Sequence, residues 1–127
     1  MAKISPQMQQ NLIQLQQLQQ KMEILVTQRL QLDRELKETE RALAELEPLD
    51  ANALVYKTIG AILVKANRDK VKEELNDRKE TLDMRIKTIM RQEERAKNDL
   101  EEKRKVVQAA LQQSQVGGMG GGFPGPM

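Results

Sequence analysis

The sequence predicts a mainly α-helical protein, in which two long helices form an antiparallel coiled coil joined by a central β-hairpin. Apolar residues recur every three and four positions in two long segments, which is the spacing of a coiled-coil seam. A short stretch between these segments alternates with a period of two and is rich in β-branched residues, as strands are. Only 2% of the 127 residues are aromatic, so a thick globular core is not expected.

The first helix is predicted over about residues 6–47. Pro6 suits the first helical turn, Ser5 is a suitable N-cap, and Pro48 ends the segment. We assign a heptad whose a positions are 8, 15, 22, 29, 36 and 43 and whose d positions are 11, 18, 25, 32, 39 and 46. Nine of these twelve positions are apolar, which is typical of a coiled coil.

The second helix is predicted over about residues 69–115, with Asn67 or Asp69 as its cap. Its a positions are 72, 79, 86, 93, 100 and 107, its d positions are 75, 82, 89, 96, 103 and 110, and eight of the twelve are apolar. In an antiparallel pairing each a position should face a d position, and pairs whose numbers sum to 118 satisfy this at every layer. This register joins apolar residues such as Leu36 and Leu82, and it centres on the expected turn. A register shifted by one heptad is the alternative, and it would move the centre away from the turn.

The β-hairpin is predicted over about residues 53–66, with Gly60 at or beside its turn. Both faces carry apolar side chains and both edges are open, and two strands alone are marginally stable in water. We therefore expect the hairpin to pair with strands of other chains. The residues assigned to this assembly role are Leu54, Val55, Tyr56, Ile59, Gly60, Ile62, Leu63 and Val64.

Apolar residues near the start of the first helix and the end of the second exceed what one seam requires. Exposed apolar patches usually bind something, although frayed ends or a dimer contact are alternatives. The candidate binding residues are Ile4, Met8, Leu12, Ile13, Leu15, Val106, Val107 and Leu111. Residues 1–115 are expected to form one domain, followed by a flexible Gly/Met-rich tail over residues 116–127.

Composition argues against several classes of function. Twenty-one basic and nineteen acidic residues give a net charge of +2, which does not favour nucleic-acid binding. The chain has no His and no Cys, so the commonest general base, metal ligands and thiol nucleophile are missing. We therefore expect that the chain binds no cofactor or metal and is not an enzyme. A carboxylate-dependent enzyme is the remaining catalytic alternative. No apolar run approaches the roughly 20 residues of a membrane span, and no signal segment is recognised, so a cytoplasmic protein without membrane contact is expected.

The hairpin block V-Y-K-x-x-G-x-x-L-V-K, at residues 55–65, resembles the β-type subunits of prefoldin. The segments at 70–75 and 91–95 and the Gln-rich first helix are similar to archaeal members, and the resemblance covers about residues 5–115. It implies an ATP-independent chaperone, a hexamer of two α-type and four β-type subunits. Their hairpins join into a platform, and the coiled-coil tips hold unfolded proteins and deliver them to a group II chaperonin. A structural coiled-coil adaptor that binds one folded partner is the alternative.

Overall fold

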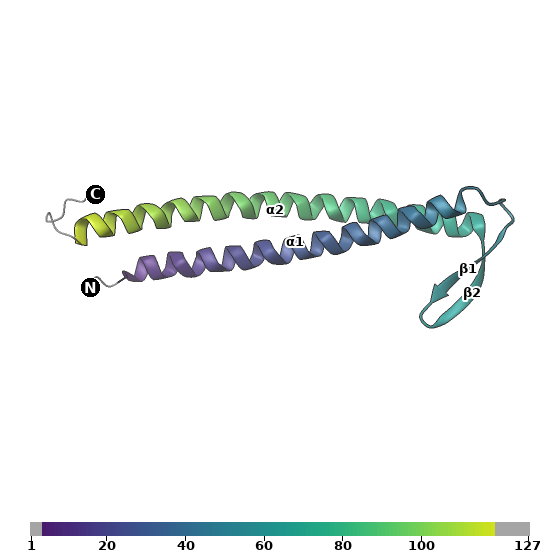
Figure 1. Cartoon of the computed structure of the whole chain (residues 1–127), viewed down its shortest axis with the longest axis horizontal. Helices are drawn as coiled ribbons and strands as arrows, with labels where there is room; N and C mark the ends of the chain where they lie inside the picture. The colour runs from purple at the N-terminus through teal and green to yellow at the C-terminus, as the bar shows by residue number, and fades with distance from the viewer. Residues whose placement is uncertain (1–3, 119–127) are drawn as a thin grey trace. The chain divides into compact units, whose positions relative to one another are not determined.

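The computed structural model describes residues 4–118, with side chains up to residue 113. The elements are helix α1 (Pro6–Leu46), strands β1 (Leu54–Ile59) and β2 (Ile62–Asn67), and helix α2 (Arg68–Gly118) (Figure 1). The predicted fold class is confirmed. The chain forms two compact units: unit 1 comprises the chain up to Val26 and from Arg91 onward, and unit 2 comprises Thr27–Met90.

Both helices begin at side-chain caps that satisfy backbone donors of the first turn. The backbone N–H of Met8 donates to Ser5 Oγ at 3.0 Å at the start of α1. At the start of α2, the backbone N–H of Asp69 donates to Asn67 Oδ1 at 2.9 Å. Ser5 is therefore the cap that the sequence predicts, and of the two candidates for α2 Asn67 is the cap.

Helix α2 ends at Gly118, three residues beyond the expected end at about 115. Glycine costs about 1 kcal/mol in a helix relative to alanine, so it weakens the last turn without forbidding it. The first residues of the segment expected to be a tail are thus helical in their backbone. The remainder of that segment, residues 119–127, lies outside the described residues.

Every predicted a and d position of both helices is buried or half-buried. In unit 2, Leu32 of α1 and Leu82 and Ile86 of α2 form a buried cluster, against which Leu36 and Ile89 pack. Two of the expected facing pairs, Leu36 with Leu82 and Leu32 with Ile86, lie in this one cluster. Burying each such side chain stabilises the pairing by about 1.5–3 kcal/mol. The predicted heptads are therefore confirmed.

The seam also accommodates a polar residue at one of its d positions in unit 2. Thr39 is buried, and its hydroxyl donates to the backbone carbonyl oxygen of Glu35, one turn earlier in α1, at 2.8 Å. This local hydrogen bond removes the cost of burying an unpaired hydroxyl.

Strands β1 and β2 pair antiparallel, from Leu54 opposite Asn67 to Ile59 opposite Ile62. Gly60 and Ala61 form the two-residue turn, and φ is positive (61°) at Gly60 but not at Ala61. A positive φ at the first turn residue alone indicates a type II′ turn, whose twist suits a hairpin and which favours glycine at that position. The turn lies where the sequence predicts it.

Candidate functional site

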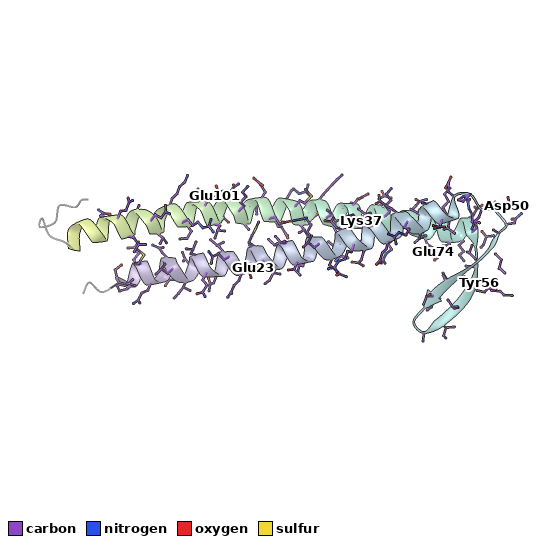
Figure 2. The ribbon with its side chains drawn as sticks, in the orientation of Figure 1. Glu23, Lys37, Asp50, Tyr56, Glu74 and Glu101 are labelled. Carbon is purple, nitrogen blue, oxygen red and sulfur yellow. The ribbon has the colours of Figure 1, made fainter. Side chains whose placement is uncertain are left out.

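The hairpin of unit 2 carries large apolar side chains that the helices do not cover. Alternation along the strands places Leu54, Tyr56 and Leu63 on one face, and Val55, Ile59, Ile62 and Val64 on the other. Leu63 is 70% exposed and Ile62 is 66% exposed. Figure 2 shows Tyr56 on the hairpin and Glu74 on α2. We call the exposed members of this set the hairpin surface: Leu54, Tyr56, Ile59, Ile62, Leu63 and Val64.

The sheet to which the hairpin belongs contains two strands within residues 4–118. The outer edge of each strand therefore has no strand beside it in this part of the chain. An unpaired edge next to exposed apolar faces is the arrangement that accepts strands from another chain.

The base of the hairpin is fixed by an arginine that the sequence analysis missed. Arg68 is the first residue of α2, and its side chain is only 11% exposed. Its Nε donates to the carbonyl oxygen of Leu46 at 3.0 Å, and its Nη2 donates to that of Glu47 at 3.0 Å. Its Nη1 donates to Asp69 Oδ1 at 2.8 Å. The acceptors at Leu46 and Glu47 are backbone carbonyls, which leave no signal in the sequence.

Beside this arginine in unit 2, Glu47 pairs with Lys72, and Lys57 pairs with Glu74. Glu47 contacts Lys72 Nζ at 3.0 Å and Arg68 Nη2 at 3.9 Å. The hydrogen bond and the charge of Lys72, with a smaller contribution from Arg68, hold the pKa of the Glu47 carboxyl below its ordinary value. Lys57 of β1 contacts Glu74 of α2 at 3.1 Å, which connects the hairpin to the helix.

In unit 1 the structure divides the eight candidate binding residues into three sets, which are buried, half-buried and exposed. Met8 is 7% exposed and Val107 is 5% exposed, because both occupy a positions of the seam. Leu12 and Leu15 are half-buried. The other four candidates are exposed, and we call them the exposed set of unit 1: Ile4, Ile13, Val106 and Leu111.

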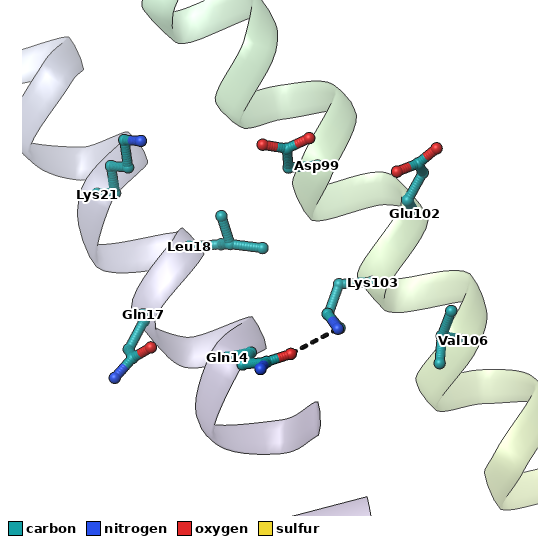
Figure 3. Close-up of a pocket in the computed structure, with 8 residues that line it drawn as sticks. All are labelled: Gln14, Gln17, Leu18, Lys21, Asp99, Glu102, Lys103 and Val106. Atoms are coloured by element: carbon teal, nitrogen blue, oxygen red, sulfur yellow. Dashed lines mark hydrogen bonds between the residues drawn. The ribbon is translucent and has the colours of Figure 1, made fainter. Parts of the chain in front are cut away.

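A groove of about 530 Å³ lies between α1 and α2 in unit 1 (Figure 3). Lys103, at a d position of the seam, donates to Gln14 Oε1 at 2.6 Å and to Asn11 Oδ1 at 3.4 Å. The lining of the groove combines apolar groups with two basic and two acidic side chains. The lining residues are Gln14, Gln17, Leu18, Lys21, Asp99, Glu102, Lys103 and Val106.

Within the described residues, neither helix is long and apolar enough to cross a membrane. Residues 4–118 hold no group of three or more His, Cys, Asp or Glu side chains that could bind a metal ion.

Comparison with known proteins identifies the family. Residues 9–114 match the model of the prefoldin subunit family. The chain belongs to this family. It is 43% identical over 111 residues to prefoldin subunit beta of Archaeoglobus fulgidus, an alignment that covers 87% of this chain and 96% of that protein. It is 35% identical to prefoldin subunit beta of Pyrococcus furiosus over 92% of this chain and all of that protein.

A solved structure agrees with the sequence relatives. The crystal structure of the prefoldin beta subunit from Thermococcus strain KS-1 matches with a TM-score of 0.78 and 40% identity, over 87% of this chain and 97% of that one. The predicted resemblance to archaeal prefoldin β subunits is thus confirmed. Prefoldin subunits are chaperone subunits rather than enzymes.

Proposed function

We propose that this chain is the β-type subunit of an ATP-independent chaperone, a cytoplasmic hexamer of two α-type and four β-type subunits. The complex binds non-native proteins and delivers them to a group II chaperonin. The observation that carries this proposal is the hairpin surface, where six large apolar side chains stay exposed on both faces of a two-stranded sheet. A two-stranded hairpin is only marginally stable in water by itself, and an exposed apolar patch of this kind is typical of a surface that other chains cover.

Client binding is assigned to the exposed set of unit 1, with half-buried Leu12 and Leu15 beside it. Met8 and Val107 support these residues from inside the seam. A few exposed aliphatic groups give a weak contact, because the apolar area that each can bury is small. Several subunits in one complex raise the effective concentration of the next contact, so avidity supplies the affinity and still permits release.

Assembly is tested by native mass spectrometry of the chain, alone and mixed with a prefoldin α-type subunit from the same source. The expected species contains two α-type subunits and four copies of this chain. A monomer or simple dimer in both samples would contradict the proposed assembly and favour the structural adaptor.

Client binding is tested by replacing Ile13, Val106 and Leu111 together with serine. The matched control replaces three other exposed apolar residues, Ile24, Met84 and Met90, with serine. The first variant is expected to lose protection of several unrelated denatured proteins from aggregation, while the control keeps it and both still form the hexamer. Equal protection by the two variants would refute the assignment, and protection of one partner only would favour the adaptor.

A further inference from the structure

The hairpin of unit 2 has little packing of its own against the helices. The residues of the hairpin surface are exposed, and Val55 and Ala66 are only half-buried. In Figure 1 the hairpin projects away from the paired helices of unit 2. Its direction must therefore be set mainly at its base, where β1 and β2 connect to α1 and α2.

The two connections at the base differ. Strand β2 runs directly into α2, since Asn67 ends the strand and Arg68 begins the helix. Strand β1 is reached through residues 47–53, whose N–H groups make three backbone hydrogen bonds, all within the α1 end and the loop: Glu47 to the Leu43 carbonyl at 3.1 Å, Leu49 to the Leu46 carbonyl at 3.1 Å, and Ala53 to the Asp50 carbonyl at 2.9 Å. A loop with so few bonds does not by itself fix the end of α1 against the start of α2.

Arg68 supplies this connection, and the Glu47–Lys72 ion pair beside it contributes little because the Glu47 side chain is 67% exposed. One guanidinium group, on the first residue after β2, bridges the carbonyl oxygens of Leu46, the last residue of α1, and of Glu47, the residue after it. Carbonyls at a helix C-terminus have no partner within the helix, so a charged donor is favoured there. We propose that Arg68 is a positioning residue that fixes the direction of the hairpin relative to the paired helices, and that this direction is required for assembly. The second half of this inference rests on the proposed function.

The chemistry favours arginine specifically. The guanidinium donates from nitrogens held in one plane, so it reaches two adjacent carbonyls and Asp69 at once. A lysine keeps the charge but lacks the planar set of donor nitrogens, so it cannot hold both carbonyls in a fixed geometry. The Lys57–Glu74 pair is the other tie between hairpin and helix, but both side chains are at least one-third exposed, and such pairs contribute little.

A fixed direction matters because a sheet built from several chains accepts each hairpin at one angle. A hairpin that samples many directions loses that freedom on assembly, and this loss weakens association. If assembly loses the free-energy contribution of one charged hydrogen bond, it becomes roughly 10-fold weaker.

The test compares Arg68→Lys with Arg78→Lys. Arg78 also lies on α2 in unit 2, and it makes one ion pair, with Glu35 at 2.8 Å, but contacts no carbonyl of α1's end. Because the sequence has no cysteine, Ala61→Cys in the turn and Met84→Cys on α2 give two unique spin-label sites. Double electron–electron resonance then measures the distribution of distances between the turn and the helix. Native mass spectrometry with the α-type subunit measures the concentration at which the complex assembles.

The proposal expects Arg68→Lys to broaden the distance distribution and to raise the concentration needed for assembly about 10-fold, with Arg78→Lys unchanged in both. A role in stability alone would lower the melting temperature but leave the distribution narrow at low temperature, which would overturn the proposal. A broad distribution in the unsubstituted chain would overturn it as well. If Arg68→Lys broadens the distribution but no version assembles, the positioning role stands and the proposed function fails.

Discussion

Replacing Ile62 and Leu63 together with serine should weaken assembly without disturbing the fold of the chain. The two residues are neighbours on β2 and point to opposite faces of the hairpin, so the double variant alters both faces. They are 66% and 70% exposed, which means that their apolar groups contribute little to folding of the single chain.

The magnitude follows from this exposure. Complete burial of an isoleucine or leucine side chain stabilises by about 1.5–3 kcal/mol, and about two-thirds of that remains available here, or about 1–2 kcal/mol per residue. Together the two residues supply about 2–4 kcal/mol for each hairpin that other strands cover. At about 1.4 kcal/mol per factor of ten, each hairpin should bind roughly 30- to 700-fold more weakly.

Sedimentation velocity across a dilution series, with the α-type subunit present, measures this shift. The control is Met84→Ser, because Met84 is 64% exposed on α2 and lies outside the hairpin surface. Circular dichroism should show the same helical signal for all three chains. If the double variant assembles at the same concentration as the control, the hairpin surface is not the assembly interface.

Three further predictions concern the stability of unit 2. Leu82→Ala should lower the free energy of unfolding by about 2–5 kcal/mol, measured by urea denaturation, because Leu82 lies in the buried cluster. Glu47→Gln should lower the free energy of unfolding at neutral pH but not in acid. Because the pKa of the Glu47 carboxyl is lowered in the folded chain, its ionised form stabilises the fold fully above the unfolded pKa of about 4.3, and this stabilisation disappears as the pH falls through the folded-state pKa. Gly60→Val should lower the free energy of unfolding by about 1–2 kcal/mol and speed amide exchange in the hairpin, because φ is positive there, whereas Ala61→Val should do neither. A Cβ at Gly60 would meet no neighbouring residue, so the loss comes from the local backbone conformation alone.

Much of the fold could be predicted because its determinants repeat along the sequence. A seam of two helices needs an apolar group at regular intervals, and each a and d position assigned from that spacing is buried or half-buried. The position of the turn could be predicted equally well, since Gly60 between two β-branched runs leaves few alternatives. The end of α2 was harder to predict, because glycine weakens a helix gradually and gives no sharp stop.

The candidate sites were predicted less completely, for two physical reasons. The heptad spacing already places Met8 and Val107 at a positions of the seam, but the candidate binding set included them beside residues such as Ile13 that the seam leaves exposed. The contact made by Arg68 escaped prediction because its partners are backbone carbonyls, which any residue could supply. A site built from main-chain acceptors becomes visible only when the elements have been placed.

The two apolar surfaces differ in a way that bears on how long each stays bound. The hairpin surface gathers six large apolar side chains on twelve strand residues, a density that resembles a permanent interface. The exposed set of unit 1 has four such side chains, one just before α1, one on α1 and two on α2, interspersed with glutamines and charges. Contacts through the second surface should therefore be weaker and more readily reversed than contacts through the first. The proposed function needs this order of affinities, since a complex that passes a client on must stay assembled while the client leaves.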